Sequence, residues 1–326
     1  MREVDGMRKV ALVMPYYGVL PSYFNFFLRS LEGKILDVLF FSDLAVGKYP
    51  ENFKQITMSF DEFKCLAEKK LGIPVRIESP KRLCDFKPMY GKIFEDYLSD
   101  YSWWAFGDCD LVYGNGFNAL LTEVEKSDAD VFSLEKMFCC GPLCFVRNTP
   151  ANNVLFKNAK GWIEVAKSLE NVIFDEIGGD WFDELRKGKI TLADCARRAP
   201  SFSAAVMLSD GVKFDYREVM EQCELNHGEV VRCNGSSDLS LDGKPICIYH
   251  YIRSKQRKYF TFVPSAYEDA QDFVIDDAGF YVTPCQKTFR FFVNRWRKFK
   301  AAARSLRKNG LARLSPKWRR QFRPET

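Results

Sequence analysis

The chain is poor in histidine, and none of its 11 cysteines forms a C-x-x-C pair. Only His227 and His250 occur among 326 residues. Structural zinc sites are usually built from close cysteine pairs together with histidine, so the sequence does not indicate a zinc finger. Cys139, Cys140 and Cys144 lie close together, and we expect them to be buried, reduced and apolar in character.

Long apolar runs are also missing. No stretch approaches the roughly 20 apolar residues that span a bilayer, and no signal-like segment follows the charged start MREVDGMRK. Disulfide frameworks are typical of small secreted chains, whereas this chain is long. We therefore expect a cytoplasmic protein whose contact with the cytoplasmic membrane is peripheral and at its inner face.

Acidic residues are nearly absent from residues 286–326, which hold 14 Lys and Arg against the single acid Glu325. The rest of the chain carries 34 basic and 42 acidic residues, so an acidic body is followed by a basic tail. Apolar residues recur in the tail every three or four positions, which predicts an amphipathic cationic helix: Phe292, Trp296, Phe299, Ala303 and Leu306.

Such a helix can lie on an anionic membrane surface, where each basic residue near the headgroups contributes about 1 kcal/mol. The alternative is a helix that packs its aromatic stripe on the protein itself. Nucleic acid is a weaker candidate partner, because the body is acidic and no nucleic-acid-binding module is recognised.

The first 115 residues alternate between apolar strand-like runs and helical patterns, in a chain that is 47% hydrophobic. This alternation predicts an α/β fold with a mostly parallel sheet covered on both faces. Ser59 begins a capping-box pattern and Gly72 closes the same helix. The expected strands are Val10–Met14, Val38–Phe41, Val75–Ile77 and the run before Asp108; the expected helices are Tyr23–Leu31, Asp61–Leu71 and Asp85–Tyr97.

Beyond Asn115 the pattern is less regular. We expect a polar surface loop around Asn234–Asp242, which is rich in Ser, Gly and Asp. The remaining predicted strands are Val131–Leu134, Leu143–Val146 and Ile246–Tyr251, and the remaining helices are Trp162–Leu169 and Asp180–Arg186.

Asp108 and Asp110 end an aromatic, strand-like run in the string WWAFGDCDLVYGN. Two carboxylates one residue apart at a strand end can both reach one divalent cation, and Mg²⁺ and Mn²⁺ prefer oxygen ligands. A polar turn is the plainer interpretation, because Gly107, Gly114 and Asn115 flank the pair. The surrounding apolar residues favour the metal, since they place charge where burial is otherwise unfavourable.

A longer set of strings resembles GT-A-type glycosyltransferases, and in particular a bacterial polysaccharide-biosynthesis group of that superfamily. The strings are MPYYGVLPSYFNFFLRS, YPENF, SFDEF, CDFKPMYG, GDCD, FVRNTPANN, FDE and IYHYIRSKQR, which together span most of residues 8–258. The resemblance implies a GT-A-like, Rossmann-like domain over residues 1–285, followed by the tail 286–326. The donor half would cover about residues 8–118 and the acceptor half about 119–260.

By this resemblance, Asp108 and Asp110 match the D-x-D motif that holds the metal and the diphosphate of a nucleotide-sugar donor, a UDP-sugar. His250 matches a late histidine that completes the metal site. Imidazole suits Mn²⁺ better than Mg²⁺, so the cofactor would be Mn²⁺, with Mg²⁺ as the alternative. Without the resemblance, His250 reads as an ordinary strand histidine between Tyr249 and Tyr251.

Further donor contacts are expected at the ends of the early strands. Tyr16 or Tyr17 would stack on the base, and Asp43 would accept a hydrogen bond from the ribose or base; plain aromatic packing and a turn are the alternatives. The resemblance places Lys87 at a phosphate and Asp85 at a sugar hydroxyl or at Lys87. Asp85 also suits the start of a helix for its charge alone.

Acids and bases later in the chain complete the expected site. Arg253, Lys255, Gln256 and Arg257 would clamp the leaving diphosphate, or form a solvated basic turn. Asp175, Glu176 and Asp180 match an acidic group on the acceptor or sugar face, with a helix N-terminus as the alternative. Amides and a guanidinium suited to sugar hydroxyls, or to a polar turn around Pro150, are Arg147, Asn148, Asn152 and Asn153.

The function expected from the sequence is therefore transfer of a sugar from a UDP-sugar to a glycan or glycolipid hydroxyl in cell-surface polysaccharide or lipopolysaccharide biosynthesis. Two other classes remain open. An aspartate-dependent phosphatase or phosphotransferase also uses D-x-D at a strand end, although normally near the first strand. A non-catalytic, membrane-associated scaffold would need the tail alone.

Overall fold

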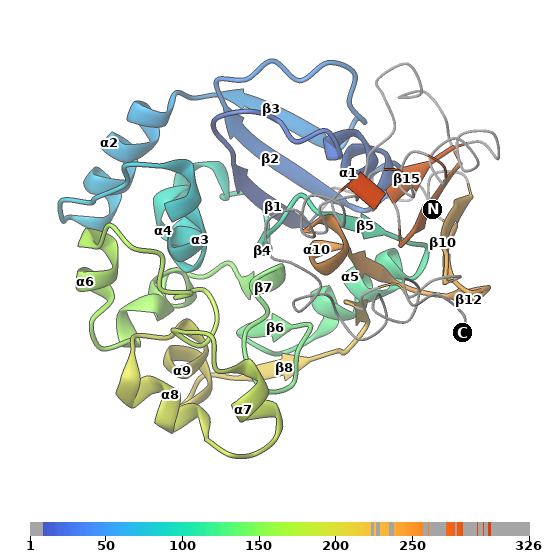
Figure 1. Ribbon diagram of the computed structural model, residues 1–326. Coiled ribbons are helices and arrows are strands. Elements are labelled where there is room, and N and C mark those ends of the chain that lie inside the picture. Colours follow the sequence, from blue (N-terminus) through green and yellow to red (C-terminus); the bar gives the residue numbers. More distant parts are fainter. Residues whose placement is uncertain are drawn as a thin grey trace, which may run out of the picture.

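A seven-stranded sheet forms the centre of the protein, in the order β3-β2-β1-β4-β7-β6-β8 (Figure 1). The computed structural model describes residues 9–222, 225, 229–234, 238–256, 260, 272–277, 279–282, 292, 296, 299 and 300. The strands of this sheet are β1 Val10–Pro15, β2 Leu36–Ser42, β3 Phe53–Thr57, β4 Trp103–Gly107, β6 Val131–Ser133, β7 Leu143–Arg147 and β8 Phe214–Tyr216.

The sheet is mixed but largely parallel. β3, β2, β1 and β4 run parallel to one another, and β8 is parallel to β6. Only β7 runs antiparallel, between β4 and β6. The predicted α/β class with a largely parallel sheet is thus confirmed, and the irregular sequence after Asn115 corresponds to the antiparallel insertion.

Helices cover both faces of the sheet (Figure 1). β1 and β2 are buried along their whole length, and alternate side chains along them enter two different apolar clusters. One cluster contains α1 Phe24–Ser30 and α5 Gly116–Lys126; the other contains α2 Phe60–Leu71, α4 Tyr90–Ile93, α6 Trp162–Lys167 and α9 Phe202–Met207. The remaining described α-helices are α3 Leu83–Phe86, α7 Phe182–Arg186, α8 Leu192–Arg198 and α10 Ile252–Lys255.

The predicted capping box is present at the start of α2. The Ser59 side chain accepts from the Glu62 N–H, and the Glu62 carboxylate accepts from the Ser59 N–H. Gly72 ends the helix in the left-handed conformation, at φ 71°.

Two of the predicted elements are wrong. Val75–Ile77 is not a strand; the third parallel strand is β3, which alternates too weakly to be recognised because it lies at the sheet edge and only Phe53 is buried in it. The expected helix over residues 85–97 is broken into α3, α4 and two 3₁₀ turns, Lys87–Met89 and Glu95–Tyr97. Pro88 explains the first break, because proline supplies no N–H to a helix and crowds the preceding turn.

A three-stranded sheet joins two strands from the later part of the chain to the region after β4. It has the order β5-β13-β9, with β5 Leu111–Tyr113, β13 Ile248–His250 and β9 Met220–Glu221. β13 is antiparallel to β5, and His250 is paired with Leu111. The predicted strand near residues 246–251 is therefore present.

A five-stranded sheet lies beside it, in the order β12-β11-β10-β14-β15. Its β11 runs through the segment expected to be a surface loop, so that expectation is wrong; β11 pairs with β10 as an antiparallel neighbour. The strands are β10 Val231–Asn234, β11 Asp238–Leu241, β12 Lys244–Pro245, β14 Phe273–Asp276 and β15 Gly279–Tyr281.

Most of the basic tail lies outside the described residues. Phe292, Trp296 and Phe299 have helical backbone and are 65%, 58% and 58% exposed, and the Lys300 ammonium lies 3.6 Å from the centroid of the Trp296 ring. The amphipathic helix as a whole stays a prediction. Among the described helices, none has the length and apolar character needed to cross a membrane.

Candidate metal centre

The two aspartates of the D-x-D motif follow β4 at the carboxyl edge of the parallel strands. β1 and β4 are neighbours in the sheet. The strands that follow β1 in the sequence, β2 and β3, lie on one side of this pair, and the later strands β6, β7 and β8 lie on the other side. In open α/β sheets, ligands bind outside the carboxyl ends of the strands at such a switch point. Asp108 leaves the sheet here, and its N–H donates to the Pro142 carbonyl at 2.9 Å.

The pairing of β13 with β5 brings His250 to these aspartates. Because His250 is opposite Leu111, its ring lies next to Asp110, with 3.2 Å between Nε2 and Oδ2. One ligand atom from each of Asp108, Asp110 and His250 lies within 4.8 Å of the others. His250 and Asp110 are buried, whereas the Asp108 side chain is 30% exposed.

The donor set fits a divalent cation. Two carboxylates and one imidazole are ligands that Mn²⁺ accepts readily, and Mg²⁺ would use mainly the carboxylates. In addition, His250 Nδ1 is buried without a hydrogen-bond partner among the residues that the structure describes. A fully buried imidazole with one unsatisfied nitrogen is uncommon in a purely structural role.

Two lysines hold the same carboxylates. Lys87 Nζ lies 2.8 Å from Asp108 Oδ1, and Lys255 Nζ lies 2.6 Å from Asp110 Oδ2. Burial disfavours the charge of Asp110, but His250 and Lys255 outweigh it and hold the pKa of Asp110 well below its ordinary value. The carboxylate is therefore ionised at neutral pH, as metal binding requires.

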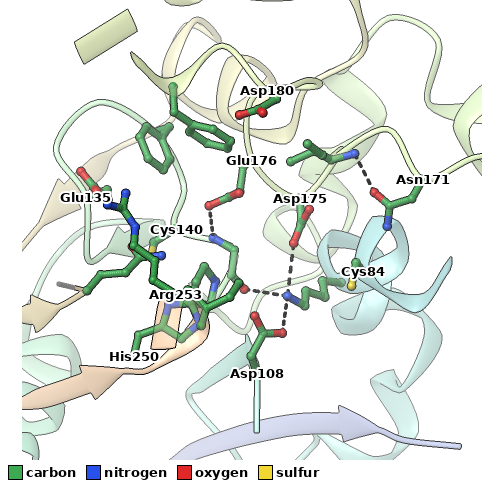
Figure 2. A pocket seen from close by; sticks show the side chains of 18 of the residues that line it. Cys84, Asp108, Glu135, Cys140, Asn171, Asp175, Glu176, Asp180, His250 and Arg253 are labelled. Carbon is green, nitrogen blue, oxygen red and sulfur yellow. Dashed lines mark hydrogen bonds and ion pairs between the residues drawn. The ribbon is translucent and has the colours of Figure 1, made fainter. Parts of the chain in front are cut away.

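A pocket of about 570 Å³ opens in front of Asp108 and His250 (Figure 2). Asp110 is not among the residues that line it. The pocket also brings together most of the later candidates, and its charged or imidazole-bearing lining residues are Lys87, Asp108, Glu135, Asp175, Glu176, Asp180, Asp183, Arg186, His250 and Arg253.

Lys87 contacts three of the residues that line this pocket. Its ammonium donates to the Gly141 carbonyl at 2.9 Å and lies 3.2 Å from Asp175 Oδ2, besides its contact with Asp108. These three partners use all three of its protons, as the dashed lines of Figure 2 show. Burial opposes the charge, but the two aspartates raise the pKa of Lys87 well above its ordinary value.

Asp175, which is buried, and Glu176, which is half-buried, form a pair of neighbouring acids that line the pocket. Burial raises the pKa of Asp175 to about 6, although Lys87 opposes the shift. Burial and the neighbouring Asp175 raise the pKa of Glu176 to about 8. Glu176 Oε1 accepts from the Gly141 N–H at 3.0 Å. The pair thus combines an acid held by an ammonium with one that is protonated at neutral pH, a combination suited to proton transfer.

Asp85 supports the acid pair from behind. It is fully buried, forms an ion pair with Arg82, and its carboxylate oxygens accept from the Phe174 N–H at 2.8 Å and the Val172 N–H at 3.0 Å. Asp85 thereby fixes the segment that carries Asp175. The expected contact of Asp85 with a donor sugar or with Lys87 does not fit this arrangement.

The residues expected at the nucleotide base are not among those that line the pocket. Tyr17 is 5% exposed and packs on Phe60 and Phe63, so its core role replaces the expected stacking. Tyr16 is half-buried on Phe40, and its hydroxyl donates to the Val19 carbonyl at 3.1 Å. Asp43 is exposed just after β2.

In the basic loop, Arg253 lines the pocket, whereas Lys255 faces Asp110 and the ring of Tyr23. Arg257 lies outside the described residues. Asp180 lines the pocket and is exposed.

The polar string FVRNTPANN serves the fold. Asn153 accepts from the Trp104 indole at 2.8 Å, Asn152 donates to Asp130 at 3.0 Å and Asn148 donates to the Leu98 carbonyl at 2.7 Å. Arg147 stacks on Trp103 and donates to a backbone carbonyl. Each of these side chains is already hydrogen-bonded within the fold, and none lines the pocket in front of Asp108.

Several pocket residues were not anticipated. Gly141 bridges Lys87 and Glu176 through its backbone, and a Cβ there would lie 2.7 Å from Asp175 Oδ2. Phe138 and Phe182 pack together at 5.2 Å, and Arg186 pairs with Glu135 at 2.5 Å. Apart from the glycine within an apolar run, no local sequence signal marks these positions.

Comparison with known proteins gives a family but no activity. The model of DUF6625, described as a family of unknown function, matches residues 12–284. No curated protein matches the chain. The match covers most of the chain, including the D-x-D motif, the acid pair and His250, and the chain therefore belongs to the family of unknown function DUF6625.

Proposed function

We propose that the protein is a metal-dependent glycosyltransferase that moves a sugar from a UDP-sugar to a hydroxyl of a glycan or glycolipid in cell-surface polysaccharide or lipopolysaccharide biosynthesis. The observation that carries the proposal is the convergence of Asp108, Asp110 and His250 within 4.8 Å, beside a pocket that is also lined by the acids Asp175 and Glu176. Metal, leaving group and acceptor would each find suitable chemistry in this one place.

The fold supports the same reaction class. The strand order β3-β2-β1-β4 is that of a nucleotide-binding half of a doubly wound sheet, and the D-x-D motif follows the strand at its switch point. The later strand β13 supplies the histidine through β5. This arrangement agrees with the GT-A-like architecture that the sequence suggests.

Each group would have a defined role. Asp108, Asp110 and His250 would hold Mn²⁺ or Mg²⁺, which supplies positive charge for a departing diphosphate. Arg253 lines the pocket and can add to that charge. Asp175, Glu176 or Asp180 would serve the acceptor hydroxyl in an inverting reaction, or stabilise a sugar cation in a retaining one.

The basic tail, residues 286–326, would hold the enzyme at the membrane surface. An acceptor anchored in the inner leaflet is best reached by an enzyme that stays at that surface, and the 14 basic residues of 286–326 attract anionic lipid. The exposed rings of Phe292, Trp296 and Phe299 would enter the headgroup region.

Calorimetric titration with Mn²⁺ and with UDP tests the proposal. The wild-type protein should bind both, and Asp108→Asn should weaken Mn²⁺ binding by at least about tenfold, since even residues that only support a ligand contribute that much. Asp61→Asn is the matched control, because Asp61 is an exposed aspartate of α2 that pairs with Lys64. Binding of neither ligand by the folded wild type would refute the proposal and favour a scaffold.

The phosphatase alternative retains one supporting contact, the 2.8 Å ion pair between Lys87 and Asp108. Release of phosphate from p-nitrophenyl phosphate, abolished by Asp108→Asn, would favour that class. No release, together with metal-dependent binding of UDP, would favour the transferase.

A further inference from the structure

Lys255 contacts one of the carboxylates that would bind the metal ion. Its ammonium lies 2.6 Å from Asp110 Oδ2, the same oxygen that is 3.2 Å from His250 Nε2. The Asp110 side chain is only 3% exposed, so water does little to screen these contacts. The lysine neutralises Asp110 in the absence of any other cation.

A divalent cation and this ammonium cannot share Asp110 without strong repulsion. An ion bound through the same carboxylate would lie within a few ångström of Lys255 Nζ, and like charges at that distance repel strongly in a partly desolvated site. The two cations would therefore compete for Asp110.

The side chain of Lys255 is more exposed than that of Lys87, whereas its backbone is held in place. Its N–H donates to the Tyr251 carbonyl at 2.9 Å, and the neighbouring Ser254 is fully buried with 3.3 Å between its hydroxyl and that of Tyr249. The Lys255 side chain is 26% exposed and ends a flexible four-carbon stem. Lys87 differs, because its side chain is 7% exposed and three acceptors hold it.

We propose that Lys255 is an exchangeable counter-cation: the metal displaces it from Asp110, and the released ammonium then binds the diphosphate that the metal also binds. This inference rests on the proposed function. It predicts that Mn²⁺ and a nucleoside diphosphate favour each other's binding more strongly than direct coordination alone provides, because the diphosphate gives the displaced lysine a new partner.

The test is a thermodynamic cycle of the full-length protein with Mn²⁺ and UDP, measured by calorimetry. In Lys255→Met, Mn²⁺ alone should bind about tenfold more tightly than in the wild type, because its competitor is gone, while UDP in the presence of saturating Mn²⁺ should bind about tenfold more weakly. The factor by which each ligand improves the other must fall by the same amount in both directions.

Lys54→Met is the matched control. Lys54 forms the same kind of cluster away from the pocket, 2.7 Å from Asp37 Oδ2 and 3.0 Å from the Tyr101 hydroxyl. The Lys54→Met variant should bind Mn²⁺ and UDP with the same affinities as the wild type. Lys255→Arg should keep most of the coupling, since the charge remains.

The outcomes separate the two proposals. If the wild type binds Mn²⁺ and UDP but Lys255→Met keeps the same coupling factor, or binds Mn²⁺ alone less tightly, the exchange is wrong and the metal centre stands. If the folded wild type binds neither ligand, the proposed function fails and the exchange fails with it. Thermal unfolding of each variant verifies that it is folded.

Discussion

Replacing Lys87 by methionine should destabilise the protein, and the loss should depend on pH. The substitution keeps the aliphatic length but removes the ammonium that contacts the buried carboxylate of Asp175, which is 5% exposed. It also leaves the Gly141 carbonyl without that donor. Removing one partner of a buried ion pair typically costs 3–5 kcal/mol.

We expect a loss of about 3 kcal/mol at pH 8, the lower end of that range, because Asp108 is 30% exposed and water can solvate it again. At pH 5.5 the loss should shrink to about 1 kcal/mol. The titration of Asp175 causes this dependence of the loss on pH. Lys87 lowers its pKa against the effect of burial, so without Lys87 the folded-state pKa rises above its present value of about 6.

The direction follows from proton linkage. An acid whose folded pKa exceeds its unfolded pKa binds more protons in the native state, so the native state loses stability as pH rises between the two values. At pH 5.5, below the raised folded-state pKa, Asp175 is protonated in the native variant and needs no cation. Above it, the variant must keep a buried carboxylate without its lysine.

Urea unfolding at pH 5.5 and pH 8, followed by fluorescence, measures both free energies of unfolding. Lys54→Met serves as the control, since the Lys54 side chain is 50% exposed, and should cost less than about 1 kcal/mol at either pH. A Lys87→Met protein as stable as the wild type at pH 8, or one with the same loss at both pH values, would refute the reasoning.

Three further predictions follow from the pocket and the tail. Gly141→Ala should cost about 1–3 kcal/mol in thermal unfolding, because the new Cβ would lie 2.7 Å from Asp175 Oδ2, whereas Gly47→Ala, with nothing within 4 Å, should cost little. Glu176→Gln should remove a stability loss that the wild type shows as pH rises from about 4.5 to about 8, seen as a flatter pH dependence of the melting temperature. Trp296→Ala should reduce co-sedimentation with anionic vesicles at low salt, and equal binding to neutral vesicles would contradict the membrane role.

Local patterns identified β1, β2 and α2 in the first half of the fold. β1 and β2 are continuous apolar runs because both of their faces are covered, and α2 carries its own start and stop signals in Ser59 and Gly72. β3 was not predicted, because an edge strand needs few apolar residues. β7 was predicted as the strand Leu143–Val146, but its antiparallel direction was not, because strand direction is decided by long-range packing.

The candidate site divides in the same way. Asp108 and Asp110 are visible because charge at the end of an apolar strand is conspicuous, and His250 was found through the family resemblance. The partners of the lysines were not predictable: Lys87 joins residues 21 and 88 positions away, Asp108 and Asp175, and no spacing rule relates them. Asp85 and Asn153 show the converse, because polar residues in a motif can be used entirely by the fold.

The separation between Asp110 and His250, 140 residues along the chain, has a consequence for biosynthesis. Chains emerge from the ribosome with their N-terminal part first, and the aspartates are made long before the strand that carries the imidazole. The three ligands of the proposed metal site would come together only after β13 has docked on β5, when all seven strands of the central sheet have been synthesised. Acquisition of the ion would therefore mark a late stage of maturation, and a chain truncated before residue 248 should take up Mn²⁺ poorly even if its parallel strands have formed.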